Sequence, residues 1–313
     1  MKFIRQYKLA YQIFNFFKKR QLVHNLPLYK KYGIHKKYHE SISSEDFIGI
    51  ESPSNKYEQL NSREEMPNDP DFCLLPESIQ DQLLSWSDDG YVILENFFTE
   101  NQIDTFNQEV DRLIKNKKVK WRYGNKIMFA IHHSQLLFNA GANERLLSIL
   151  KLLLGKEVDL FQSINFYTGS EQRTHSDSIH MSTFPYGNLI AVWIAMEDIK
   201  PDSGPLHYYP GSHKLPYIWN RNYGNIGSKY KLGSKSYADY EDKVEEIIAQ
   251  SKLDKKIFLP QKGDLLIWHA NLLHGGELRT NPERTRRSMV FHYYAKDSIC
   301  FHEITQRPTL KRK

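Results

Sequence analysis

Cysteine is scarce in this chain, and acidic residues are almost absent from its beginning. Two cysteines, Cys73 and Cys300, occur among 313 residues. They exclude a disulfide framework and a multi-cysteine zinc or iron–sulfur site, and they fit the reducing compartment of a cytoplasmic protein. The apolar stretch 9–17 is too short and too polar to span a bilayer. It is also no signal peptide, because the basic run 18–20 stands where a cleavage site would follow.

The positive charge is concentrated at the N-terminus. Residues 1–40 carry ten Lys or Arg and one acid, Glu40, a net charge of +9 against +6 for the whole chain, so the remaining residues sum to −3. The body of the protein therefore shows no basic, aromatic-interleaved surface, and we expect no nucleic-acid module. With 13% aromatic and 26% charged residues, the chain has the composition of a globular protein with one large domain or two small ones.

Residues 1–45 are predicted to form a basic amphipathic arm. Apolar side chains recur at helical spacing between Phe3 and Phe17, at Phe3, Tyr7, Ala10, Phe14 and Phe17, with Ile4 and Tyr11 beside them. The favoured interpretation is that this aromatic face packs on the catalytic domain. The alternative is that residues 1–37 contact an anionic membrane surface, which would make the protein peripheral to the membrane.

The rest of the chain predicts a domain over 75–300 after a linker at 46–74, with a basic tail at 301–313. Ser85 to Gly90 is expected to form a turn, and helices are expected after the capping box at 99–102, over 143–154 and over 237–253. Short apolar segments bounded by Gly, Pro, Asn and Ser predict strands, at 91–94, 158–167, 188–197, 256–259, 264–269 and 288–295. This order indicates a double-sheet jelly roll with helices outside. The insertion 221–254 is either a lid or a solvated surface excursion.

Two histidines and one aspartate have a spacing that suits a metal. His175 and Asp177 stand two residues apart, so on an extended segment their side chains share a face. His274, directly after the predicted strand 264–269, would be the third ligand. Two imidazoles and one carboxylate are the ligand set of non-haem Fe(II) oxygenases, which leaves three coordination positions open. Among 13 histidines this spacing alone is a weak signal.

Other histidines and arginines near this set offer alternatives. His269 is the rival third ligand, although its alternation with buried neighbours favours a position at the edge of the core. His207 and His213 flank a Pro-Gly turn and are expected to form hydrogen bonds at the surface. After His274, a guanidinium could bind the far carboxylate of 2-oxoglutarate through two hydrogen bonds. The candidates are Arg279, Arg284, Arg286 and Arg287.

Seven sequence blocks in order resemble the phytanoyl-CoA dioxygenase family, over about 85–295. They are 89–97, 174–177, 193–198, 203–206, 210–214, 263–276 and 285–290. The resemblance implies a mainly β fold with flanking helices and a double-stranded β-helix (jelly roll, cupin-like) core. It also implies a site in which His175, Asp177 and His274 bind Fe(II).

The resemblance further implies that Arg286 binds 2-oxoglutarate, with Arg287 as the alternative. Gln162, Asn165 and Trp193 correspond to positions that line the co-substrate pocket in relatives. Halogenating relatives replace the metal-binding carboxylate with a small residue. The presence of Asp177 therefore favours hydroxylation.

The implied function is that of an Fe(II)/2-oxoglutarate-dependent dioxygenase. It would use O2 to hydroxylate an unactivated C–H bond of a small-molecule or lipid-like metabolite, while 2-oxoglutarate is decarboxylated to succinate. Two other functions stay open, a catalytically silent jelly-roll binding protein and a jelly-roll metalloenzyme that does not use 2-oxoglutarate. The intact ligand set speaks against the first, and the arginine after His274 speaks against the second.

Overall fold

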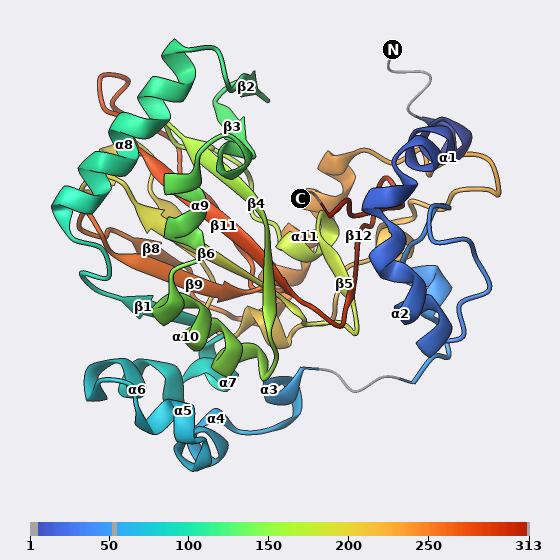
Figure 1. The fold of residues 1–313 in the computed structure, drawn as a ribbon, viewed down its shortest axis with the longest axis horizontal. Coiled ribbons are helices and arrows are strands. Elements are labelled where there is room, and N and C mark those ends of the chain that lie inside the picture. The colour runs from blue at the N-terminus through green and yellow to red at the C-terminus, as the bar shows by residue number, and fades with distance from the viewer. Residues whose placement is uncertain (1–5, 52–54, 312–313) are drawn as a thin grey trace.

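The centre of the fold is a seven-stranded antiparallel sheet in a computed structural model that describes residues 6–51 and 55–311. Its strands, in spatial order, are β1 (Tyr91–Leu94), β9 (Leu265–His269), β6 (Leu189–Ala195), β11 (Ser288–Ala295), β4 (Val158–Phe166), β3 (Lys126–Met128) and β2 (Trp121–Arg122). A second sheet contains β10 (His274–Gly276), β7 (Leu206–Tyr208) and β8 (Lys256–Phe258). The expected jelly roll is therefore confirmed, with strand ends within a few residues of the prediction (Figure 1).

The central strands β9, β6 and β11 are buried on both faces, which explains why they are almost continuously apolar. Along β6, Val192 and Ile194 belong to the core under the helices, whereas Trp193 packs toward the second sheet with Leu206 and Phe258. The covering helices include α6 (Glu77–Leu84), α8 (Glu100–Lys115), α9 (Gln135–Gly141) and α10 (Glu144–Leu154), seen together on one side in Figure 1. Because helices cover one face of the large sheet, the functional side chains lie on the other face, between the two sheets.

Two segments before the sheet differ from expectation. The predicted turn at Ser85 to Gly90 contains a short helix, α7 (Trp86–Asp89), which ends at Gly90 with φ of 73°. The predicted linker folds into α3 (Lys56–Gln59), α4 (Ser62–Glu65) and α5 (Pro70–Cys73). Tyr57, Met66 and Phe72 anchor these helices in the main core. Such isolated apolar residues in a polar segment give no periodic signal, so the sequence did not predict this packing.

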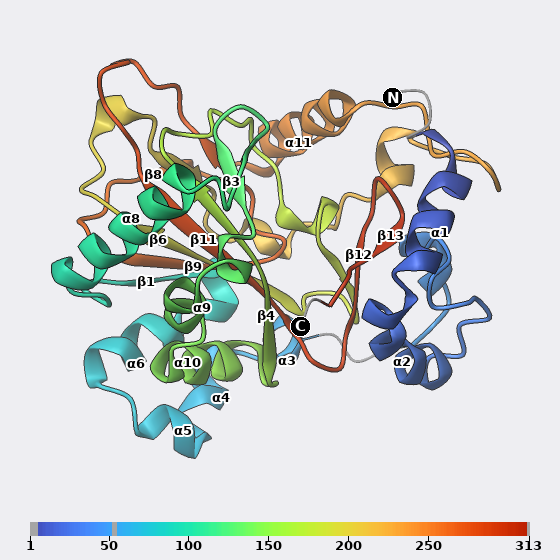
Figure 2. The same ribbon diagram turned by 45° about the horizontal axis from the view of Figure 1, so that its top comes forward.

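The N-terminal arm covers a third sheet, formed by β13 (Arg307–Pro308), β12 (Ile299–His302) and β5 (Ser182–Phe184). Figure 2 shows α1 (Lys8–Phe17) and α2 (Leu26–Lys31) beside β12 and β13. A separate apolar cluster joins them; it contains Tyr29, Ile42, Phe47, Phe184, Ile299 and Phe301. The predicted basic tail thus begins inside a packed sheet.

The expected packing of the aromatic face of α1 is only partly observed. Tyr11 is half-buried and Asn15 is buried, with its amide donating to the carbonyl of His39. Phe14 and Phe17, in contrast, are exposed, the latter by 79%. The inward stripe runs through Tyr7, Tyr11 and Asn15, which follow each other at intervals of four. Phe3 and Ile4 lie outside the described residues. Among the described residues, no helix combines the length and the apolar character needed to cross a membrane.

The insertion 221–254 packs against the body through its helix, whereas most of residues 221–236 are exposed. Its helix α11 (Tyr237–Ser251) buries Tyr240 and Val244 against Ile179 and Leu273. The segment before α11 pairs with the arm, because the Lys8 amide donates to the carbonyl of Tyr230 at 2.9 Å. Backbone hydrogen bonds therefore join the arm to the insertion.

Candidate metal centre

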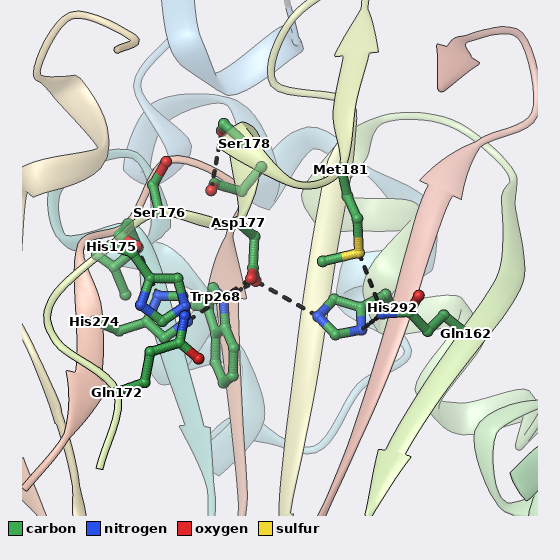
Figure 3. A network of polar contacts seen from close by, with 12 residues as sticks. Gln162, Gln172, His175, Ser176, Asp177, Ser178, Met181, Trp268, His274 and His292 are labelled. Atoms are coloured by element: carbon green, nitrogen blue, oxygen red, sulfur yellow. Dashed lines mark hydrogen bonds and ion pairs between the residues drawn. The ribbon is translucent and has the colours of Figure 1, made fainter. Parts of the chain in front are cut away.

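His175, Asp177 and His274 converge between the sheets. One ligand atom from each residue lies within 4.8 Å of the others, and all three residues are buried. His175 and His274 face each other across an isolated antiparallel bridge, in which each backbone amide donates to the other's carbonyl at 2.9 Å. Asp177 follows at the start of a short 3-10 turn. Figure 3 shows the two imidazoles and the carboxylate pointing toward one another.

Backbone hydrogen bonds orient both imidazoles. Nδ1 of His175 donates to the carbonyl of Arg173 at 2.9 Å, and Nδ1 of His274 donates to the carbonyl of Leu272 at 2.9 Å. In each ring the other nitrogen, Nε2, is thus unprotonated in the neutral form and available to a metal. Such outer hydrogen bonds fix the tautomer of metal-binding histidines.

The Asp177 carboxylate is held at one oxygen. The indole of Trp268 donates to Oδ2 at 2.9 Å, and Nε2 of His292 lies 3.6 Å from the same oxygen. The other oxygen, Oδ1, faces Nε2 of His274 at 3.9 Å. One carboxylate oxygen therefore remains for a cation shared with the two imidazoles.

The environment sets the charges that a cation site needs. Burial, reinforced by the neighbouring His274, holds the pKa of His175 well below its ordinary range, so this imidazole is neutral. Burial by itself would raise the pKa of Asp177. Coulombic interactions with His274 and His292, together with a hydrogen bond from His292, outweigh burial and hold that pKa below its usual range. The neutral imidazole of His175, the ionised carboxylate of Asp177 and the imidazole of His274 are donor groups suited to a divalent transition metal.

A cavity of about 680 Å³ opens beside these residues. Gln162, Trp193 and Arg286, three of the residues predicted to contact the co-substrate, line it. Asn165 does not, which corrects the prediction for this residue. It pairs with Ile127 and Met289, both part of the core under the helices, because strand alternation sends it away from the cavity that Gln162 and Ile164 line.

Only one of the two neighbouring arginines enters the cavity. Arg286 is 2% exposed and lies against the rings of Phe166 and Trp193. The side chain of Arg287 turns to the other side, where Nη2 lies 2.5 Å from Asp111. The two neighbouring side chains thus lie on opposite sides, and Arg286 is the one that lines the cavity.

The other histidines occupy defined places. His269 is buried at the edge of the core, as expected, with Nε2 3.3 Å from Glu58. The expected surface role of His207 and His213 is wrong, because both are buried. His207 sits in the middle of β7 next to β10, where its ring nitrogens lie 2.8 Å from Thr174 and 2.7 Å from Glu277.

Several cavity residues carry no signal in the sequence. Lys126 on β3 donates to the side chain of Gln172 at 2.9 Å and lies over the ring of Phe166. Trp268 and His292 were not assigned to the site, although both sit on strands that were predicted correctly. Their alternation with Leu266 on β9 and with Val290 on β11 could have indicated their side of the sheet, but only once the sheet order was known.

Comparisons with known proteins agree with this geometry. The phytanoyl-CoA dioxygenase family model matches residues 86–288. The ectoine dioxygenase of Stutzerimonas stutzeri is 27% identical over 228 residues, which cover 66% of this chain and 73% of that protein. The phytanoyl-CoA dioxygenase domain-containing protein 1 of Bos taurus is 25% identical over 179 residues, which cover 54% of this chain and 56% of that protein.

Solved structures show the same fold at low sequence identity. The α-ketoglutarate-dependent carbocyclase SnoK from nogalamycin biosynthesis superposes with a TM-score of 0.58 at 16% identity, covering 73% of this chain and 87% of SnoK. EctD of S. alaskensis, solved with 2-oxoglutarate and 5-hydroxyectoine, superposes with a TM-score of 0.53 at 19% identity. The match covers 67% of this chain and 74% of EctD.

The jelly roll, its buried His-Asp-His set and the match to the phytanoyl-CoA dioxygenase family model together define an Fe(II)/2-oxoglutarate-dependent dioxygenase. Because the family model covers more than half of the sequence, the chain belongs to the phytanoyl-CoA dioxygenase family.

Proposed function

We propose that this dioxygenase hydroxylates a small molecule, that His175, Asp177 and His274 bind Fe(II), and that Arg286 binds 2-oxoglutarate. The observation that carries the proposal is the convergence of two Nε2 atoms and one carboxylate oxygen. In each of these three side chains the other polar atom is already held by a hydrogen bond. When bound, Fe(II) and 2-oxoglutarate activate O2, and 2-oxoglutarate leaves as succinate. The retained carboxylate of Asp177 supports hydroxylation over halogenation.

The surroundings of Arg286 support its role. Its Nε donates to the carbonyl of Gly204 at 3.2 Å, and Nη1 donates to the hydroxyl of Ser288 at 2.7 Å. Within residues 6–51 and 55–311, no carboxylate forms an ion pair with this guanidinium. Burial lowers the pKa of Arg286 to about 10, which still leaves it charged at neutral pH. A buried, unpaired cation is costly, so an anionic ligand such as the far carboxylate of 2-oxoglutarate would stabilise it.

The cavity walls contribute positioning and water exclusion. Phe166 and Trp193 hold the Arg286 guanidinium between aromatic faces. Trp268 forms a further part of the lining and at the same time fixes Asp177. An enclosed, largely apolar wall around a few polar groups is typical of small-molecule sites.

The first experiment measures succinate and the charge-transfer band of the Fe(II)·2-oxoglutarate complex. Anaerobically iron-loaded protein should develop this band on addition of 2-oxoglutarate and should form succinate when O2 is admitted. Arg286→Gln should weaken 2-oxoglutarate binding on the order of 100-fold, since a buried charged hydrogen bond is lost. Arg287→Gln is the matched control and should bind 2-oxoglutarate normally.

The ligand set is tested by iron binding. His175→Ala should lose Fe(II) affinity in equilibrium dialysis while its circular dichroism stays that of the wild type. If His175→Ala bound Fe(II) as tightly as the wild type, the ligand assignment would fail. If the wild type produced neither band nor succinate, the proposed activity itself would fail.

We further propose that residues 1–37 contact anionic membranes and that the substrate is lipid-like. The supporting observation is the exposed pair Phe16 and Phe17, which is followed by the basic run 18–20. Apolar side chains beside lysines are typical of helices that lie in a membrane interface.

Co-sedimentation with vesicles tests this contact. The wild type should pellet with phosphatidylserine-containing vesicles, and a Phe16→Ser, Phe17→Ser variant should pellet several-fold less. Leu74→Ser, which removes an apolar side chain that is 83% exposed elsewhere, is the control. Equal pelleting of all three proteins would contradict the membrane contact.

A further inference from the structure

One end of the cavity lies at the third sheet and contains a second arginine besides Arg286. There it is lined by His180, His302 and Arg307. His302 and Arg307 are cross-strand partners on β12 and β13, and the rings of His180 and His302 lie 5.5 Å apart. This end lies under the N-terminal arm, where Figure 2 shows β12 and β13 beside α1. The residues thus lead from the metal centre toward Arg307, since the rings of His175 and His180 are 6.1 Å apart.

Arg307 has an aromatic neighbour but no acidic partner. Its guanidinium lies over the ring of Tyr11, 5.3 Å from the centroid. Among the residues that the structure describes, no Asp or Glu forms an ion pair with it. Asp177 is the one carboxylate in the described lining of the cavity. A stacked arginine that lacks a carboxylate partner keeps its hydrogen-bond donors for a ligand.

The charges in the cavity favour an anion even after the co-substrate is bound. Fe(II), Asp177 and doubly charged 2-oxoglutarate together sum to one negative charge, which Arg286 neutralises. Lys126 and Arg307 then remain in excess. In an enclosed site such an excess attracts anions and disfavours cations, because the low dielectric strengthens both effects.

We propose that Arg307 binds an anionic group of the substrate, a carboxylate or a phosphate, and that Tyr11 positions Arg307 for this purpose. The inference rests on the proposed function and specifies its substrate as an organic anion. Tyr11 and Arg307 lie outside the residues 86–288 that match the family model. The N-terminal arm and the C-terminal strands would therefore provide this chain's own selectivity.

The test uses matched neutral and anionic probes. Hexanoate, hexyl phosphate and hexanamide are titrated anaerobically into the Fe(II)·2-oxoglutarate complex, and the perturbation of its charge-transfer band is recorded. Thermal unfolding of the metal-free protein with each probe gives a second readout. The wild type should respond to an anion at a concentration about tenfold lower than to hexanamide, as expected for one hydrogen bond to a charged group.

Variants assign this preference to Arg307. Arg307→Gln should reduce the preference to about twofold or less, whereas Arg307→Lys should retain part of it, because a point charge still attracts the anion. Tyr11→Leu should raise the hexanoate concentration needed and leave 2-oxoglutarate binding unchanged. Arg145→Gln is the control, because Arg145 also stacks on an aromatic ring, that of Phe97, but does not line the cavity.

The outcomes separate this inference from the proposed function. An equal response to hexanoate, hexyl phosphate and hexanamide, or no response to any of them, would overturn the role of Arg307, and so would a preference that survives Arg307→Gln. Failure of the wild type to form the band with 2-oxoglutarate would instead contradict the proposed function. Comparing free hexyl phosphate with the same phosphate on a vesicle-bound lysolipid distinguishes a soluble substrate from a membrane lipid.

Discussion

Single side chains outside the ligand set control the metal centre. Asp177 could bind a metal through either oxygen or both. Trp268 occupies Oδ2 with a hydrogen bond of 2.9 Å, so Oδ1 is the oxygen that faces His274. Asp177 would therefore hold the metal through Oδ1, beside the two imidazoles.

Removal of this indole donor should weaken metal binding. Trp268→Phe should lower Fe(II) affinity about 10- to 100-fold, the usual effect of losing an outer hydrogen bond to a ligand. Trp193→Phe is the matched control, because Trp193 lines the same cavity and its indole nitrogen has no hydrogen-bond partner among the described residues. Competition with a fluorescent chelator measures both affinities. Equal loss in the two variants would show that packing, not the hydrogen bond, is responsible.

The site is enclosed in part by elements whose role the sequence did not predict. Helix α11 belongs to the insertion, yet its Tyr240 accepts a hydrogen bond from the amide of Ser176, between two ligand residues. Tyr237 accepts another from Gln172. Arg173, next along the same segment, pairs with Asp242 and Glu245 at its exposed end. The insertion therefore supports the segment that carries two ligands.

Loss of the Tyr240 hydroxyl should destabilise this support. Tyr240→Phe leaves the buried amide of Ser176 without a partner, at a cost of about 1–3 kcal/mol in the free energy of unfolding. Tyr237→Phe should cost less, because Tyr237 and Gln172 are only half-buried and water can replace the lost bond. Urea unfolding of the two variants and the wild type gives the comparison. A larger effect at Tyr237 would refute the assignment of the support to Tyr240.

At the scale of the whole molecule, the arm is part of the fold. The main core lies between the large sheet and its helices, and a second apolar cluster joins the arm to the third sheet. Arg307 and Tyr11 meet at the same junction, which also borders the cavity. The packing that stabilises the arm on the third sheet therefore also holds Arg307, the residue proposed to select the substrate.

Tyr29 tests whether the arm is integral. Tyr29→Ala should lower the free energy of unfolding by about 3–5 kcal/mol, as for other large-to-small changes of buried aromatic residues. Tyr230→Ala, at a position that is 66% exposed, should change it little. Thermal denaturation followed by circular dichroism distinguishes the two. An unchanged transition in Tyr29→Ala would mean that the arm is only appended to the domain.

The sequence by itself determined the local chemistry. The pair His175 and Asp177 shares a face because extended residues alternate, and the strand before His274 is long and apolar enough to be recognised. The capping box before α8 is equally local, and its two hydrogen bonds are present in the structure. These features depend on a few neighbouring residues, so they are visible without the fold.

Only the tertiary structure decided which face of each strand looks into the cavity. Strands buried on both sides lack polar alternation, so the sequence could not separate Arg286 from Arg287 or place Asn165 under the helices. The burial of His207 and the contact of Tyr11 with Arg307 depend on partners distant in the chain. Such partners are chosen by sheet order and packing, which no local pattern encodes.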